Sequence, residues 1–483
     1  MSYDRRLALL VPLALAAFLV QQDALEAQLP IEAASIDSIF ETWDREGSPG
    51  CAVGVYRGGE LVLDRGYGEA NLDWGIPIDR TTVFYSGSIS KQFAAATAVL
   101  LHLNGTLDLD ADVRTWIPEL PPYEPAVTLR QLISHTAGVR DIYGLIGLSG
   151  GRTTDAWTDE EYLELIARQV ELNHEPGSAY LYSNGGYYLI TTAIERSTGQ
   201  RLDEAARELI FEPLGMNDTH FHQDRERIVA RRAMSYGGSA NAGFRQTYLG
   251  NFDKSGAGGL YTTLEDMAHW DRNFATGELG GEAFLELMLT PGVLSNGDTL
   301  TYGAGVQLGT DQGRRILGHG GSFMGFRADY VRYRDDDLAV VALCNLGGIN
   351  PGPLTRRVAR ALLGPAPTTG SAQGSAAGSG TGGAAQGTQA TRDDPPPPSA
   401  PLRAYAGRYH SPEVGATIEI VWTGSELRIR RTPNADGATL DLVRGDRFSQ
   451  GNWTLDFEIE EGEPVALRLD AGRVRNLLYT RER

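Results

Sequence analysis

One long stretch without large apolar side chains divides the chain into two parts that can each fold. Residues 365–400 consist mostly of Gly, Ala, Ser, Thr and Pro and end in four consecutive prolines. Such a stretch has no apolar surface to bury, so it predicts a flexible linker that is stiffened at its proline end. The 483-residue chain is therefore expected to form a large N-terminal domain and a small C-terminal one.

The two parts differ in their hydrophobic patterns. Residues 401–483 alternate apolar and polar side chains, for example over 417–421, which predicts a small all-β, barrel-like domain. Residues 28–364 carry strand-like segments at 51–67 and 302–344, starting with a predicted strand over 302–308, and helix-like segments between them. A loop is expected over 139–157.

The N-terminus has the pattern of an export signal. Arg5 and Arg6 precede an apolar run from Leu7 to Val20 that is short for a membrane span, and Ala27 is a small residue suited to cleavage. We predict a signal peptide over residues 1–27, with an uncleaved anchor as the alternative. The mature protein would be periplasmic or secreted, without stable insertion in a membrane.

The chain contains only two lysines, and one of them follows a serine by three residues. Lys91 and Lys254 stand among 43 Lys and Arg residues. Lysine, unlike arginine, exchanges a proton near neutral pH when burial lowers its pKa. Ser88 and Lys91 share one side of a helix predicted over 89–103. This spacing is typical of a serine nucleophile with a lysine beside it, although a serine at a helix start is also a common N-cap.

Two further polar segments lie downstream and are weak signals individually. Tyr182-Ser183-Asn184 leads into a predicted helix, and a Gly-rich turn ends a predicted strand at residues 319–322. In this order, the three segments resemble the motifs of the serine β-lactamase and penicillin-binding-protein superfamily. The pattern is similar to the branch of class C β-lactamases, D-aminopeptidases, D-alanyl-D-alanine carboxypeptidases and esterases. Similar runs extend the resemblance over about residues 35–363.

The resemblance implies a fold in which Ser88 lies between two subdomains. The fold class would be α/β (α+β) of the β-lactamase/transpeptidase type, with an antiparallel sheet flanked by helices plus an all-helical subdomain. The C-terminal β-domain resembles lipocalin-like modules of some relatives. Such a module would cover the site and limit substrate size, or it would mediate oligomerisation.

The resemblance also implies roles for the motif residues. Ser88 would attack an acyl carbonyl and form an acyl-enzyme, with Tyr182 or Lys91 as the proton acceptor of a coupled pair. Asn184 would bind Lys91 and the substrate amide. The backbone N–H groups of Ser88 and Ser322 would form the oxyanion hole.

Position 319 departs from the pattern of many family members, which have lysine there. A histidine titrates near neutrality, whereas lysine holds a fixed charge for a substrate carboxylate. We therefore expect hydrolysis of short esters and D-amino-acid amides or peptides in preference to penicillins. The alternatives are a true β-lactamase, a D-alanyl-D-alanine carboxypeptidase or a non-catalytic cell-wall-binding protein. The predicted substrate-binding residues of this segment are His319, Gly320, Gly321 and Ser322.

Several other residues compete with these candidates. Lys254 begins a rival third motif, and residues 147–151 match the Gly-x-Ser-x-Gly nucleophile elbow around Ser149 without the strand that an elbow requires. His220 and His222 begin a zinc-like pattern that no further ligand continues. His135 is expected to form structural hydrogen bonds near the site. We therefore predict no metal and no cofactor.

Cys51 and Cys344 begin and end the outer strand-like segments of the N-terminal domain. The resemblance implies that their strands are neighbours, so a disulfide is expected as one alternative, with two buried free thiols as the other. The net charge of −19 and the lack of a basic block argue against a nucleic-acid partner. The expected partner is a small-molecule or peptide substrate, and the sequence does not assign an oligomeric state.

Overall fold

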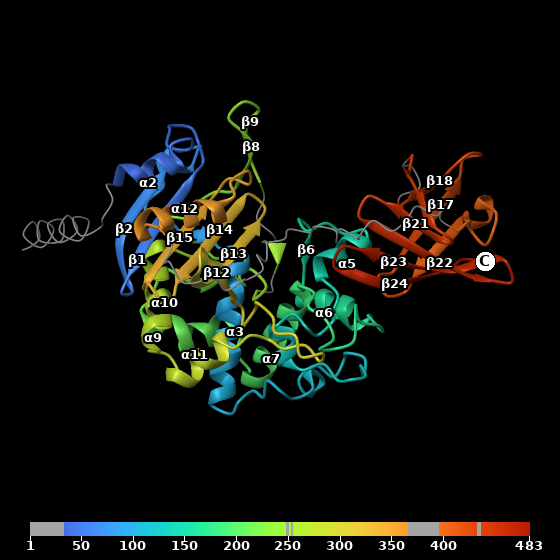
Figure 1. The fold of residues 1–483 in the computed structure, drawn as a ribbon, viewed down its shortest axis with the longest axis horizontal. Coiled ribbons are helices and arrows are strands. Elements are labelled where there is room, and N and C mark those ends of the chain that lie inside the picture. The colour runs from blue at the N-terminus through green and yellow to red at the C-terminus, as the bar shows by residue number, and fades with distance from the viewer. Residues whose placement is uncertain (1–32, 248–250, 253–254, 366–395, 432–435) are drawn as a thin grey trace, which may run out of the picture.

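The structure is a computed structural model in which a large mixed domain is followed by a small β-domain (Figure 1). The predicted signal peptide, most of the predicted linker and Lys254 lie outside the described residues. Within the described part of the chain, no helix is long and apolar enough to cross a membrane. The described residues are 33–247, 251–252, 255–365, 396–431 and 436–483.

A six-stranded antiparallel sheet forms the frame of the large domain, in the order β12-β13-β14-β15-β1-β2. The strands that are last in sequence thus pair with the first ones, and β1 lies between β15 and β2. This pairing joins the two ends of the large domain in one sheet, so the chain between β2 and β12 forms a long insertion between neighbouring parts of that sheet. The strands are β1 (Cys51–Arg57), β2 (Glu60–Tyr67), β12 (Gln307–Asp311), β13 (Arg314–Phe323), β14 (Phe326–Tyr333) and β15 (Leu338–Cys344).

Alternate side chains of the central strand β1 enter two different hydrophobic cores, as the two-residue period of a strand requires. Val53 and Val55 belong to one core, and Ala52 and Tyr56 belong to the other. Helices therefore cover both faces of the sheet, which buries all of β15 and all but one residue each of β1 and β14. Helices α2 (Ala33–Phe40) and α12 (Pro351–Leu363) pack on the first face, and α10 (Leu264–Thr276) packs on the second.

The two cysteines lie opposite each other on neighbouring strands. Cys51 of β1 is in register with Cys344 of β15, and the structure joins their sulfur atoms in a disulfide. Both residues are buried in the core beneath α2 and α12.

The first strand of the C-terminal half of this sheet begins later than expected. The predicted strand over 302–308 is wrong in its bounds, because β12 spans Gln307–Asp311 and shares only residues 307–308 with it. The residues that precede β12 pack closely against the helix that contains Lys91. A Cβ at Gly305 would lie 2.5 Å from the Lys91 carbonyl oxygen, and Tyr302 is buried with its hydroxyl at His319.

Helices dominate the chain between Ser88 and the return to the sheet. The predicted loop over 139–157 is wrong in part, because it contains helix α5. The Asp141 carboxylate caps this helix by accepting hydrogen bonds from the backbone N–H groups of Tyr143 and Gly144. The helices of this region are α3 (Ser90–Leu103), α4 (Leu129–Ile133), α5 (Ile142–Leu148), α6 (Asp159–Ala167), α7 (Asn184–Thr198), α8 (Leu202–Ala206), α9 (Glu212–Leu214) and α11 (Gly281–Leu289).

Short strands and 3-10 turns connect these helices to the sheet. The turn η1 (Gly87–Ile89) follows β5 and carries Ser88 directly into α3. The short strands are β3 (Glu69–Asn71), β4 (Ile76–Pro77), β5 (Phe84–Tyr85), β6 (Ala156–Trp157), β7 (His220–Phe221), β8 (Tyr236–Ser239), β9 (Gly243–Gln246), β10 (Asn251–Phe252) and β11 (Leu260–Thr262).

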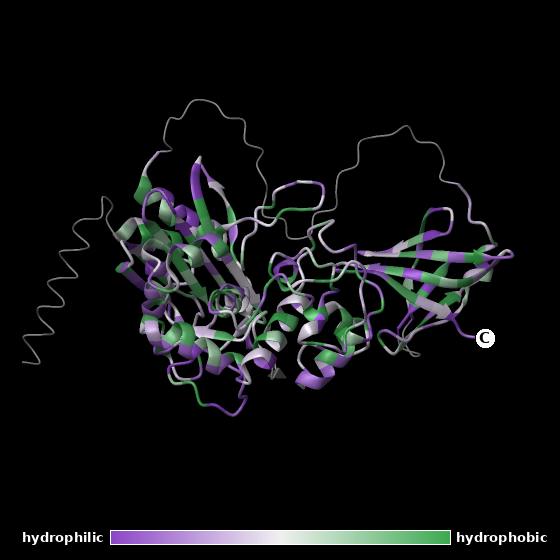
Figure 2. Cartoon of the chain, turned by 90° about the horizontal axis from the view of Figure 1, so that it is seen from below, coloured by the Kyte–Doolittle hydropathy of each residue, from purple (hydrophilic) through white to green (hydrophobic). Residues whose placement is uncertain are grey.

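The C-terminal domain is one antiparallel nine-stranded sheet, in the order β19-β18-β17-β16-β24-β23-β22-β21-β20. Its two edge strands are consecutive in the chain, so the sheet must curl to bring its edges together. Polar and apolar residues alternate along the strands (Figure 2). The strands are β16 (Gly407–Ser411), β17 (Ala416–Trp422), β18 (Leu427–Arg430), β19 (Ala438–Thr439), β20 (Asp441–Arg444), β21 (Arg447–Gln450), β22 (Trp453–Glu460), β23 (Glu463–Ala471) and β24 (Val474–Arg481).

These two architectures confirm the predicted fold class: an α+β domain with a helical subdomain, followed by an all-β domain. The last residues of the predicted linker belong structurally with the β-domain. Pro396 accepts a backbone hydrogen bond from Gly445, and Ser399 donates two hydrogen bonds to the Asp446 carboxylate.

Candidate active site

Ser88 lies where the sheet and the helical region meet. Its turn η1 is pressed against the backbone of β13, and glycines on both sides permit this approach. Gly87 has a φ of 58°, and a Cβ there would lie 2.5 Å from the Ser322 nitrogen. A Cβ at Gly321 would lie 1.9 Å from the Ser86 carbonyl oxygen and 3.3 Å from the Ser88 nitrogen. The backbone N–H groups of Ser88 and Ser322 are thereby brought close together.

Lys91 is fully buried one turn after Ser88. Its Nζ lies 3.3 Å from Ser88 Oγ, 2.9 Å from Asn184 Oδ1 and 2.6 Å from the Ala257 carbonyl oxygen. The last two atoms are carbonyl oxygens, which only accept hydrogen bonds. As an ammonium, Nζ donates to all three oxygens, whereas as a neutral amine it has two N–H donors for the carbonyl oxygens and a lone pair left for the Ser88 hydroxyl. Sequence reasoning missed the Ala257 contact.

Tyr182 and Asn184 stand at the start of α7 because Ser183 caps this helix. The Ser183 hydroxyl accepts a hydrogen bond from the Gly186 N–H at 3.1 Å. The cap leaves Tyr182 on the extended lead-in and Asn184 in the first turn. Tyr182 forms a side-chain hydrogen bond with Ser88, and the centroid of its ring lies 4.8 Å from Lys91 Nζ.

Asp141 is a buried residue of this site that sequence reasoning missed. Its Oδ2 accepts hydrogen bonds from the backbone N–H of Asn184 at 2.9 Å and from Asn184 Nδ2 at 2.8 Å. These bonds fix the amide orientation, so that Asn184 Oδ1 faces Lys91. The aspartate precedes an apolar run, which is a helix-cap signal, but nothing local to it indicates Asn184.

Burial moves the pKa values of the two candidate proton acceptors in opposite directions. It lowers the pKa of Lys91 well below the usual value, an effect that Asp141 opposes and Arg473 reinforces. It raises the pKa of Tyr182, and the hydrogen bond with Ser88 and the nearby Arg473 offset only part of this shift. Both shifts favour the neutral side chain. A neutral lysine accepts a proton, whereas a neutral tyrosine donates one.

His319 lies beside these groups but has both ring nitrogens occupied. Nδ1 is 2.6 Å from the Gly320 carbonyl oxygen, so this nitrogen carries the proton, and Nε2 accepts from the Tyr302 hydroxyl at 3.0 Å. Burial, followed by the proximity of Lys91, lowers the pKa of His319 to about 4. The imidazole is therefore neutral at pH 7, and its ring centroid lies 6.3 Å from that of Tyr182.

His135 packs against the ring of Tyr182 and binds the backbone of the next residue. Its ring centroid lies 4.2 Å from that of Tyr182, and its Nδ1 accepts a hydrogen bond from the Ser183 N–H at 3.2 Å. Burial lowers the pKa of this histidine well below its usual value. The structure thus gives His135 the hydrogen-bonding role expected from the sequence.

The competing motifs lie in settings that do not suit their chemistry. Ser149 follows helix α5 and donates its hydroxyl to the Ile146 carbonyl oxygen at 2.9 Å, so no strand precedes it as an elbow requires. His220 and His222 face each other at 3.4 Å. Across the described ranges, no group of three or more His, Cys, Asp or Glu side chains is arranged to hold a metal.

Two family models match separate parts of the chain. The family model described as beta-lactamase matches residues 36–364, and a domain of unknown function, DUF3471, matches residues 391–478. The D-aminopeptidase of Gluconobacter oxydans (strain 621H) is 30% identical over 297 residues, which cover 62% of this chain and 56% of that protein. The D-aminopeptidase of Cereibacter sphaeroides (strain KD131 / KCTC 12085) is 29% identical over 448 residues, which cover 90% and 80%.

Solved structures show the same fold. An octameric penicillin-binding protein homologue from Pyrococcus abyssi superposes with a TM-score of 0.61 at 21% identity, covering 93% of this chain and all of that one. The D-amino acid amidase from Ochrobactrum anthropi SV3 complexed with L-phenylalanine gives a TM-score of 0.57 at 23% identity, with coverages of 69% and 99%.

Proposed function

The chain belongs to the beta-lactamase family, and we propose that it is a serine hydrolase that forms an acyl-enzyme on Ser88. We further propose that it cleaves amide and peptide bonds of D-amino acids, and short esters as well. The names of the relatives support this substrate class, since two of them are D-aminopeptidases with 29% and 30% identity. The geometry around Lys91 carries the mechanistic part of the proposal.

In this mechanism Lys91 is the base that activates Ser88. A serine hydroxyl is a poor nucleophile until its proton is removed. The pKa of Lys91 is lowered by burial, and its two carbonyl partners leave the lone pair directed at Ser88 Oγ, 3.3 Å away. Tyrosinate is the less accessible base, because burial raises the pKa of Tyr182.

Tyr182 then serves as the proton donor to the leaving group. As Ser88 Oγ bonds to the acyl carbon, its proton passes to Lys91, and the resulting ammonium lies beside the Tyr182 ring. Collapse of the tetrahedral intermediate breaks the bond to the leaving amine or alcohol, which takes the phenol proton of Tyr182 while Lys91 returns a proton to the tyrosine. Water hydrolyses the acyl-enzyme by the reverse route.

The backbone N–H groups of Ser88 and Ser322 receive the charge that develops on the carbonyl oxygen. Their close approach across Gly87 and Gly321 supports this oxyanion hole. Asn184, held by Asp141, keeps Lys91 in place and has a remaining amide N–H for the substrate. His319 contributes through Tyr302 and the strand end rather than as a charged group.

Export is also part of the proposal. The apolar run from Leu7 to Val20 after two arginines supports a signal peptide over 1–27, and the disulfide between Cys51 and Cys344 is compatible with an oxidising compartment. N-terminal sequencing of the mature protein tests this: a start at or near residue 28 is expected, and an intact N-terminus would contradict it.

A substrate panel tests the proposed activity. Short p-nitrophenyl esters, D-amino-acid amides, D-Ala-D-Ala peptides and nitrocefin should be compared on the wild type and on Ser88→Ala. We expect esters or D-amino-acid amides and peptides to be cleaved faster than nitrocefin, and all cleavage to depend on Ser88. Efficient nitrocefin turnover with poor ester and amide cleavage would contradict the proposed substrate class.

A further inference from the structure

The turn between β23 and β24 of the C-terminal domain reaches the active site. The Arg473 carbonyl oxygen accepts hydrogen bonds from the Asp141 N–H at 3.3 Å and from Asn173 Nδ2 at 3.0 Å. Val474, the next residue, is fully buried, and a Cβ on Gly144 would lie 2.7 Å from its methyl group. The tip of this hairpin is therefore packed against the residues that begin helix α5.

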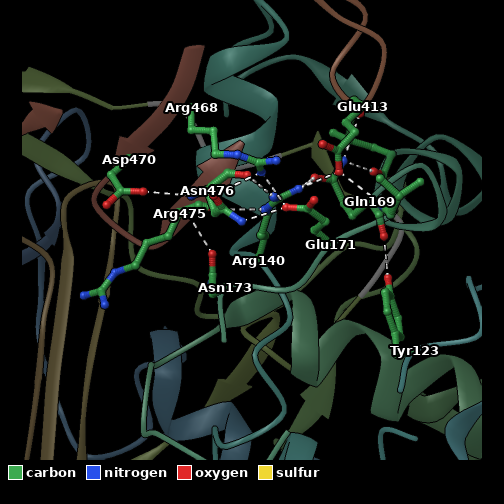
Figure 3. Close-up of polar contacts among 12 residues, drawn as sticks. Tyr123, Arg140, Gln169, Glu171, Asn173, Glu413, Arg468, Asp470, Arg475 and Asn476 are labelled. Atoms are coloured by element: carbon green, nitrogen blue, oxygen red, sulfur yellow. Dashed lines mark hydrogen bonds and ion pairs between the residues drawn. The ribbon is translucent and has the colours of Figure 1, made fainter. Parts of the chain in front are cut away.

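A buried arginine next to Asp141 holds this hairpin in place (Figure 3). Arg140 has only 1% of its surface exposed. Its guanidinium binds Glu413 Oε2 at 2.6 Å, the Arg475 carbonyl oxygen at 3.0 Å and the Asn476 carbonyl oxygen at 2.8 Å. All three partners belong to the C-terminal domain, so the hairpin has a fixed position relative to the catalytic domain.

The side chain of Arg473 points from this fixed turn to the catalytic residues. Its Nη1 lies 3.3 Å from Asp141 Oδ2, and its guanidinium carbon lies 5.3 Å from the centroid of the Tyr182 ring. The side chain is 46% exposed, whereas that of Asp141 is 3% exposed. A guanidinium has five N–H donors in a planar fork, so the ion pair with Asp141 leaves further donors on this partly exposed side chain.

Among the residues that the structure describes, the other cationic candidates at the site, Lys91 and His319, cannot meet an anion in this way. Lys91 is fully buried, and its three partners are all protein atoms. His319 is 4% exposed, with both ring nitrogens occupied. Arg473 is thus a cation at this site whose side chain is partly exposed to solvent and whose backbone is held by hydrogen bonds.

We propose that the C-terminal domain supplies Arg473 to the active site as the residue that binds a carboxylate of the substrate. Arginine binds carboxylates through paired, charge-assisted hydrogen bonds, which set orientation as well as affinity. The positive charge of Arg473 also disfavours a substrate that would place a free ammonium at the position of this carboxylate. This inference rests on the proposed function and narrows it to amides and peptides with a carboxylate close to the scissile bond.

Matched substrates test the role of Arg473 in the full chain. The substrates are an N-acyl-D-Ala-D-Ala peptide with a free C-terminal carboxylate, the same peptide as its C-terminal amide, and p-nitrophenyl acetate. We expect Arg473→Gln to lower kcat/KM for the free acid by about 10- to 100-fold and to leave the other two substrates within about threefold. Arg473→Lys should retain part of the preference, because it keeps the charge but loses the fork.

Arg475→Gln is the matched control, since its side chain extends away from the contacts in Figure 3 while its backbone belongs to the same hairpin. It should leave the ratio of acid to amide cleavage unchanged. Equal losses on all three substrates in Arg473→Gln would show that this arginine acts only through Asp141 and would overturn the proposal. An unchanged ratio would overturn it as well.

A binding measurement separates this inference from the proposed activity. Calorimetry on Ser88→Ala should show that N-acetyl-D-alanine binds at least about tenfold more tightly than N-acetyl-D-alaninamide, and that adding Arg473→Gln removes the difference. Equal affinities in Ser88→Ala would contradict the role of Arg473. Unchanged hydrolysis by Ser88→Ala would instead contradict the proposed function and leave the binding result standing.

Discussion

The two sides of the active site differ in burial, in charge and in the domain that provides them. The N-terminal domain provides Ser88, Lys91 and Tyr182, which are held by local helix starts, and the pKa shifts of Lys91 and Tyr182 favour their neutral forms. The C-terminal domain provides Arg473, which is charged and half exposed. In the proposed mechanism, the reaction depends on desolvated groups, whereas selection among substrates depends on the charge of Arg473, which water still reaches. The predictions below test this separation.

Loss of the nucleophile Ser88 should lower kcat/KM more than any other change, and the matched change at Ser149 should not. We expect Ser88→Ala to lower kcat/KM by about 10⁴-fold or more on every substrate, because covalent catalysis is removed. Ser149→Ala, the matched change at the rival motif, should stay within about twofold. Steady-state kinetics on an ester and on a D-amino-acid amide measure both, and a strong loss in Ser149→Ala would contradict the assignment.

Removal of the proposed base should have the next largest effect. Lys91→Met is expected to lower kcat/KM by about 10²- to 10⁴-fold, the usual range for loss of general base catalysis. In the wild type, kcat/KM should rise with pH as Lys91 loses its proton, at a pH well below its usual pKa because burial favours the neutral amine. Tyr182→Phe should lose rate but keep this acidic limb. Disappearance of the limb in Tyr182→Phe would assign the base to the tyrosine instead.

The junction between the two domains should depend on its buried ion pair. In Glu413→Gln, the charge of Arg140 remains buried without its counter-ion, so we expect the free energy of unfolding to fall by about 3 kcal/mol. Glu171→Gln removes a more exposed partner, that of Arg468, and should cost about 1 kcal/mol or less. Urea unfolding followed by tryptophan fluorescence compares the two. Equal small effects would show that the junction does not depend on the Arg140 pair.

The smallest effects should be opposite in sign on the two sides of the site. Asp141 raises the pKa of Lys91 and Arg473 lowers it. The acidic limb of kcat/KM for a neutral ester should therefore move to lower pH in Asp141→Asn and to higher pH in Arg473→Gln, with changes at the plateau below about tenfold. Shifts in the same direction would show that neither charge reaches Lys91 as described.

The sequence predicted those parts of the site that depend on neighbours in the chain. Ser88 and Lys91 lie one helical turn apart, so their spacing predicts that they face the same side. Tyr182 and Asn184 flank a helix cap, and the order of the motifs identified them by resemblance. The Ala257 contact with Lys91 is made by a backbone carbonyl, which no side-chain pattern reports.

Contacts between distant segments were not predictable in this way. Asp141 and Asn184 are 43 residues apart, and Arg140 and Arg475 are 335 residues apart. Helix α5 was missed because its segment is rich in glycine, which disfavours helices, and tertiary packing of residues such as Leu145 overrides that preference. The sequence therefore did not predict that Arg473 of the C-terminal domain lies beside the catalytic residues.

Labelling with a fluorophosphonate, followed by peptide mapping, tests the central claim most directly. This probe bonds covalently to an activated serine and does not label a protein that only binds substrate. We predict a single adduct on the peptide containing Ser88 in the wild type and in Ser149→Ala, and none in Ser88→Ala. An adduct on Ser149, or an unlabelled Ser88 in protein that hydrolyses ester, would contradict the account.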